Sequence, residues 1–109
     1  MARISIADKA AAAAQAADEA QADANGYARA AQEKLDAARG HGRRHPAWEW
    51  VEYAEQSARR AGEYARQAAA AARAHDIPEA NRRLRNAQSE SYGARSNADR
   101  ALKEAEQAW

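Results

Sequence analysis

The chain has 109 residues, the usual size of one domain, and its 17 basic and 16 acidic residues leave a formal net charge of +1. Alanine supplies 35 residues, whereas leucine, isoleucine and valine together number seven, and cysteine is absent, which excludes disulfides, thiol catalysis and thiolate metal sites. Because alanine is the best helix former and loses no side-chain entropy on ordering, this composition predicts an all-α protein.

The first predicted helix covers about residues 5–39. Ser5 and Asp8 have the spacing of a capping box at its start, and Gly40 and Gly42 end it. Its small apolar residues recur in steps of three and four, with one extra step of four that is expected to unwind a supercoil locally. The repeat is Ile6, Ala10, Ala13, Ala17, Ala20, Ala24, Ala28, Ala31, Leu35 and Ala38.

The second predicted helix covers about residues 46–74, after a corner that ends at Pro46. Proline suits the first turn of a helix because its missing N–H needs no partner there. Steps of four and three alternate along this helix without a break and make a heptad seam. The seam is Ala47, Val51, Ala54, Ala58, Ala61, Ala65, Ala68 and Ala72.

The third predicted helix covers about residues 77–108. Asp76 is expected to cap its start, and Glu79 is expected to complete a reciprocal capping pattern with it. The heptad seam continues along this helix as Ala80, Leu84, Ala87, Ser91, Ala94, Ala98, Ala101, Ala105 and Ala108.

Short corners make consecutive helices antiparallel neighbours. The sequence therefore predicts one domain, residues 1–109, folded as an elongated antiparallel three-helix bundle with alanine-rich, coiled-coil-like heptad seams. The antiparallel register places Leu35, Val51 and Leu102 at one level, with the tryptophans nearby. The large aliphatic residues expected at the opposite end are Ile4, Ile6, Ile77 and Leu84.

Three glycines fall inside the predicted helices at nearly the same height: Gly26, Gly62 and Gly93, each close in sequence to a tyrosine. A mid-helix glycine costs about 1 kcal/mol relative to alanine, so each needs a compensating contact. We expect tyrosine rings packed over bare backbone, or a shared bend, and a docking notch is the alternative.

Catalytic and metal chemistry find little support in the sequence. His41 and His45 are four residues apart, but the surrounding glycines make this segment a loop beside the end of helix one, where cations are favoured. Carboxylates such as Glu55 and Glu79 have the spacing of surface ion pairs with Arg59 and Arg83. We therefore expect no enzyme activity, no metal, no cofactor and no small-molecule substrate.

The aromatic residues near the first corner are the sharper feature. Trp48 and Trp50 flank the seam of helix two, Tyr53 points away from it, and Trp109 lies at the end of the sequence. Exposed aromatic residues are enriched at protein interfaces. The sequence therefore predicts a non-enzymatic helical scaffold or protein–protein interaction module that binds another protein or itself through Trp48, Trp50, Tyr53 and Trp109.

Two alternatives stay open. A nucleic-acid-associated protein would use the arginines at the two bundle ends, although they are divided between those ends and the net charge is only +1. A carrier or precursor polypeptide would be recognised or modified at Trp109. With no apolar stretch of the length that spans a bilayer, the expected location is the cytoplasm, with no membrane partner. The arginines in question are Arg43, Arg44, Arg82, Arg83 and Arg85.

Overall fold

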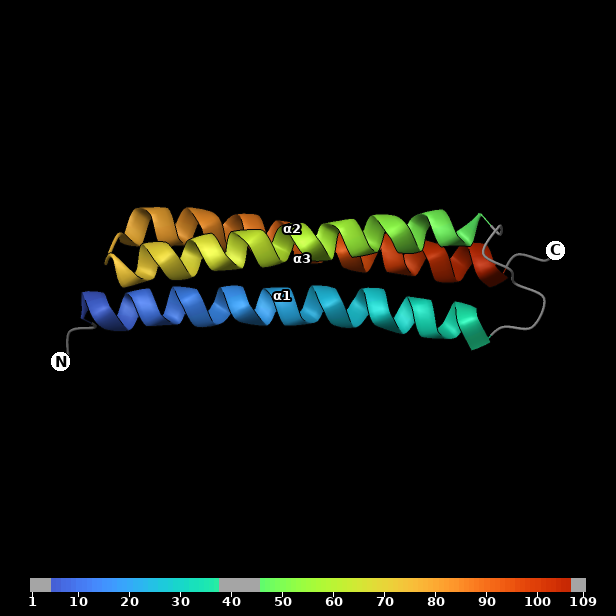
Figure 1. The fold of residues 1–109 in the computed structure, drawn as a ribbon, viewed down its shortest axis with the longest axis horizontal. Helices are drawn as coiled ribbons and strands as arrows, with labels where there is room; N and C mark the ends of the chain where they lie inside the picture. Colours follow the sequence, from blue (N-terminus) through green and yellow to red (C-terminus); the bar gives the residue numbers. More distant parts are fainter. Residues whose placement is uncertain (1–4, 38–45, 107–109) are drawn as a thin grey trace.

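The computed structural model describes residues 5–37 and 46–106, which form three long helices. They are α1 (Ile6–Ala37), α2 (Ala47–Arg73) and α3 (Ile77–Glu106). Consecutive helices run antiparallel and each packs against the other two, most extensively α2 against α3 (Figure 1). The predicted elongated three-helix bundle is confirmed. Both ends of α2 and the starts of α1 and α3 lie within one residue of the expected positions, whereas residues 38–39 and 107–108, where the other two helices were expected to end, lie outside the described residues.

Side-chain caps begin two of the helices. The Ser5 hydroxyl accepts a hydrogen bond from the backbone N–H of Asp8 at 3.0 Å, and the Asp76 carboxylate accepts one from the N–H of Glu79 at 3.2 Å. Both caps were predicted. The reciprocal part at α3 is wrong, because the Glu79 carboxylate binds Arg82 and Arg83 instead of turning back to Asp76.

The corner between α2 and α3 is short because the chain reverses through a left-handed residue. His75 has a φ of 56°. Its N–H donates to the carbonyl of Ala72 at 3.0 Å, and the N–H of Asp76 donates to that of Ala71 at 2.9 Å. This is the Schellman arrangement, which satisfies the last carbonyls of a helix. It brings α3 directly back along α2.

The core follows the predicted alanine seams. All eight seam positions of α2 are buried, as are those of α1 from Ala10 to Leu35, across the extra step of four. In α3 the seam positions are buried except Leu84 and Ala105, which are half-buried, and Ala108, which lies outside the described residues. Ile6 departs from the prediction, because 59% of its surface is exposed.

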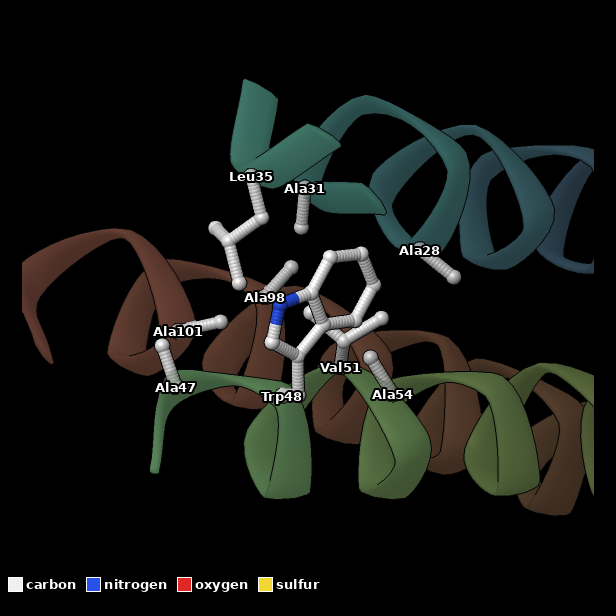
Figure 2. Close-up of a cluster of buried hydrophobic side chains, with 9 residues drawn as sticks. All are labelled: Ala28, Ala31, Leu35, Ala47, Trp48, Val51, Ala54, Ala98 and Ala101. Atoms are coloured by element: carbon white, nitrogen blue, oxygen red, sulfur yellow. The ribbon is translucent and has the colours of Figure 1, made fainter. Parts of the chain in front are cut away.

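Large side chains concentrate at one end of this core. Leu35, Trp48 and Val51 are buried in one cluster with six alanines, and Leu102 packs against it. Figure 2 shows the indole of Trp48 filling the space between α2 and Leu35 of α1. The predicted level of Leu35, Val51 and Leu102 is thereby confirmed.

The opposite end of the bundle is built from smaller groups. Leu84 packs there against the buried alanines Ala13, Ala71 and Ala80. Ile6 lies at this end as predicted but is exposed and adds little to the core, Ile77 is half-buried, and Ile4 lies outside the described residues. Alanine methyl groups therefore carry most of the packing at this end.

The three mid-helix glycines do not share one environment. A Cβ added to Gly62 would lie 2.9 Å from the side-chain nitrogen of Gln21, and one added to Gly93 would lie 3.3 Å from the hydroxyl of Ser57. A Cβ on Gly26 would meet no such atom within 4 Å. Polar side chains of a neighbouring helix, not tyrosine rings, pack closest to Gly62 and Gly93, so the predicted ring packing is wrong there.

Candidate interaction surface

The four aromatic residues proposed for partner binding divide into different environments. Trp48 is only 5% exposed and belongs to the core cluster. A partner could reach its indole only if the bundle opened, so its role as a contact residue is corrected to that of a core residue. Trp109 lies outside the described residues. Trp50 and Tyr53 remain as surface candidates.

Trp50 and Tyr53 form one aromatic pair on α2. They are three residues apart, which places them on the same side of the helix. Their ring centroids are 5.6 Å apart with an interplanar angle of 77°, the edge-to-face geometry that aromatic pairs prefer. Trp50 packs against the core cluster, whereas 47% of Tyr53 is exposed. The pair therefore joins the core to the surface.

Arg100 of α3 completes this surface. Its guanidinium carbon lies 5.2 Å from the centroid of the Trp50 ring, within the range of a cation–π interaction. Its Nε donates to the Glu104 carboxylate at 3.0 Å, one helical turn further along α3. These contacts fix the orientation of Trp50 from both helices. We call Trp50, Tyr53 and Arg100 the aromatic patch.

Sequence reasoning missed Arg100. The antiparallel register that places Val51 level with Leu102 also places Trp50 within one turn of Arg100 and Lys103. That register could have suggested a cation beside the indole. It could not have chosen between the two, because the choice depends on which side of α3 faces Trp50.

The predicted basic cluster on α3 is partly neutralised by its own helix. Arg82 and Arg83 both form ion pairs with Glu79, and the Arg83 contact measures 2.7 Å. The hydrogen bond from Arg83, together with the charge of Arg82, lowers the pKa of the Glu79 carboxyl below its ordinary value. Arg85 is exposed, and Arg43 and Arg44 lie outside the described residues. The single carboxylate of Glu79 thus compensates one of the three positive charges of the α3 arginines.

An ion pair also joins α2 to α3 away from that cluster. Arg60 donates through Nε to Glu90 at 2.8 Å and lies within 3.4 Å of the Ser57 hydroxyl. Half of the Arg60 side chain is exposed. Exposed pairs of this kind contribute on the order of 0.2–1 kcal/mol, so Arg60 can exchange partners at small cost.

The grooves between the helices are shallow and open to solvent. One between α1 and α3 has a volume of about 310 Å³ and is lined mainly by Ala12, Ala13, Ile77 and Leu84.

Within residues 5–37 and 46–106, no three His, Cys, Asp or Glu side chains gather closely enough to hold a metal ion. None of the three helices in those ranges is both long and apolar enough to cross a membrane.

Three features of this surface stand together: an edge-to-face aromatic pair, a guanidinium over the indole, and a neighbouring carboxylate that holds the guanidinium. Comparisons of the chain with models of protein families, with curated proteins and with solved structures found no match.

Proposed function

We propose that this chain is a non-enzymatic helical scaffold or protein–protein interaction module that binds a partner protein at the aromatic patch. The observation that carries the proposal is the Trp50–Tyr53 pair, partly exposed and held beneath Arg100. Tryptophan, tyrosine and arginine are the residue types enriched among the few interface residues that dominate binding free energy.

The fixed geometry of the patch supports this proposal. Ordering a flexible side chain on binding costs about 0.5–1.5 kcal/mol, so side chains that are already ordered bind more tightly for the same contact area. Trp50 is ordered by the core on one side and by Arg100 on the other. Tyr53 presents its exposed half beside them. A partner with an apolar pocket bordered by a carboxylate would fit this arrangement.

A non-enzymatic role is supported by how the carboxylates are used. Glu79, Glu90 and Glu104 each pair with an arginine on the surface. The Arg83 hydrogen bond moves the pKa of Glu79 further below neutrality, whereas a general acid or base works best with a pKa near the working pH. These groups act as surface ion pairs in our proposal. A cytoplasmic location stays a prediction.

The test is site-specific cross-linking in the producing cells. A photoreactive amino acid in place of Tyr53 should capture one defined partner, whereas the same group in place of Tyr92 should not. Tyr92 is the matched control because it is 71% exposed but lies on α3, outside the patch.

The captured partner is then purified and its affinity measured. Tyr53→Ala and Arg100→Ala should each weaken binding about tenfold, the effect of losing about 1.4 kcal/mol at an interface. Tyr92→Ala should bind as the unmodified chain does. Equal capture from both positions, or a partner that binds Tyr53→Ala with full affinity, would overturn the proposal.

A further inference from the structure

A second regular stripe runs along α2 on the side opposite the buried seam. Its residues alternate steps of four and three, as the seam does, and every one of them is exposed. We call it the outer stripe: Glu49, Tyr53, Gln56, Arg60, Glu63, Gln67 and Ala70. Coiled-coil helices pack along stripes of this spacing, which are apolar there. Here only Tyr53 and Ala70 are apolar, so a partner would be selected by charge.

The outer stripe is complementary to its own reverse. When two copies are laid antiparallel about a point midway between Arg60 and Glu63, each Arg60 faces the Glu63 of the second copy. Gln56 then faces Gln67, and Tyr53 faces Ala70. A two-fold axis repeats each of these contacts, as an isologous interface requires. No like charges meet along the stripe in this arrangement.

Charges beside the stripe favour the same orientation. Acidic residues occupy the beginning of α2, at Glu49, Glu52 and Glu55, whereas Arg66 and Arg73 lie towards its end. Antiparallel pairing brings Glu52 within one turn of Arg73 of the second copy, and Glu55 within one turn of Arg66. Arg59 also comes within one turn of Arg66, a like-charge contact that the opposite-charge contacts must outweigh. Parallel pairing would instead set each charge against its own copy, which is destabilising.

We propose that the outer stripe of α2 binds a second copy of this chain in antiparallel orientation. The stripe shares Tyr53 with the proposed function but uses neither Trp50 nor Arg100. Arg60 would exchange or share its contact with Glu90 to reach Glu63 of the second copy. Because Tyr53 is the one large hydrophobic side chain in the stripe, the contact is small and polar. Such an interface gives a weak dimer that salt weakens further.

Sedimentation velocity of the full chain over a range of concentrations tests the proposal. The unmodified chain should move from monomer towards dimer as concentration rises, and less so at high salt. Glu63→Arg and Arg60→Glu should each weaken the dimer at least tenfold, because each places like charges across the two-fold axis. Tyr92→Ala on α3 should leave the dimer unchanged.

Mixing the two variants gives the decisive result. In a pair made of one Arg60→Glu chain and one Glu63→Arg chain, both central contacts join opposite charges again, so the mixture should dimerise as the unmodified chain does. The double variant should also dimerise. Circular dichroism checks that each chain is helical; if Arg60→Glu and the double variant unfold because both lose the contact with Glu90, Glu63→Arg keeps that contact and still decides.

Orientation is checked with single cysteines, which is possible because the chain has none. A mixture of Gln56→Cys and Gln67→Cys should form a disulfide between the two variants, whereas Gln56→Cys alone should cross-link only if the helices run parallel. A chain that stays monomeric, or a dimer that neither charge reversal weakens, would overturn the proposal. If the chain stays monomeric while a different protein is captured at Tyr53, the proposed function survives and this inference fails.

Discussion

The two ends of the bundle use different means of packing. At the tryptophan end, defined by Leu35, Trp48 and Val51, large side chains are buried among alanines. At the alanine end, defined by Ala13, Ala71 and Ala80, the only large residue packed in the cluster, among the residues that the structure describes, is the half-buried Leu84. The same three helices and the same heptad seams run through both. The comparison indicates that seam spacing determines the topology, whereas side-chain volume determines how much each end contributes to stability.

The packing difference between the two ends is tested most directly by removing the large buried side chain of Trp48. Trp48→Ala should lower the free energy of unfolding by about 3–5 kcal/mol, because it loses apolar burial and leaves a cavity. Leu84→Ala at the alanine end should cost less, since Leu84 is already partly exposed. Urea unfolding followed by circular dichroism measures both. Equal losses at the two ends would show that the tryptophan end is not the more strongly packed one.

The close packing of the alanine part of the seam is tested by enlarging a buried side chain instead of removing one. Ala65 is 1% exposed in the alanine part of the seam, so Ala65→Leu should destabilise the bundle by about 1–3 kcal/mol through overpacking. Ala70→Leu, on the exposed side of α2, is the matched control and should not destabilise it. If Ala65→Leu stabilised the chain, the helices would leave unfilled space around Ala65.

Sequence reasoning succeeded where one regular pattern decided the outcome. The step of four and three from Ala47 to Ala72 predicted every buried seam position of α2, because helical geometry alone turns those positions to one side. The burial of the α1 seam across its extra step of four was also predicted from spacing, whereas the local unwinding expected there stays a prediction. Antiparallel register then placed Leu35 opposite Val51.

Sequence reasoning failed where the outcome depended on which neighbour a side chain meets. Trp48 and Trp50 looked alike in sequence, yet the first points into the core and the second towards Arg100. Glu79 could serve either as a capping partner or as an ion-pair partner, and the two arginines that follow it decided the choice. Ile6 lies on the seam but too near the helix end to be covered.

The corner at the alanine end offers a stabilising change. His75 adopts a positive φ, which costs a residue with a Cβ about 1–2 kcal/mol and costs glycine little. His75→Gly should therefore raise the free energy of unfolding by about 1 kcal/mol. Ala74→Gly is the control, because Ala74 has a φ of −84° and gains nothing from glycine. Thermal melts of both variants measure the difference; a lower melting temperature for His75→Gly would contradict the backbone argument.

The smallest expected effect concerns the Glu79 ion pairs at the start of α3. The hydrogen bond from Arg83 lowers the folded-state pKa of Glu79, and its place in the first turn of a helix also favours the negative charge. A carboxyl group with a lowered folded pKa stabilises the folded chain above its unfolded pKa, and that contribution is lost as the pH falls through the folded pKa.

Glu79→Gln should therefore melt slightly below the unmodified chain at pH 7, and the difference should shrink as the pH falls below the ordinary range of a glutamate pKa. Asp99→Asn is a useful control, since Asp99 is an exposed carboxylate near the other end of α3. High salt should reduce the Glu79 difference at pH 7, because exposed charges are screened. If the difference persisted unchanged into acid and high salt, Glu79 would be stabilising α3 through helix packing rather than charge. The stability of the alanine end would then depend less on the interactions at its corner, formed by Asp76 and His75, than their geometry implies.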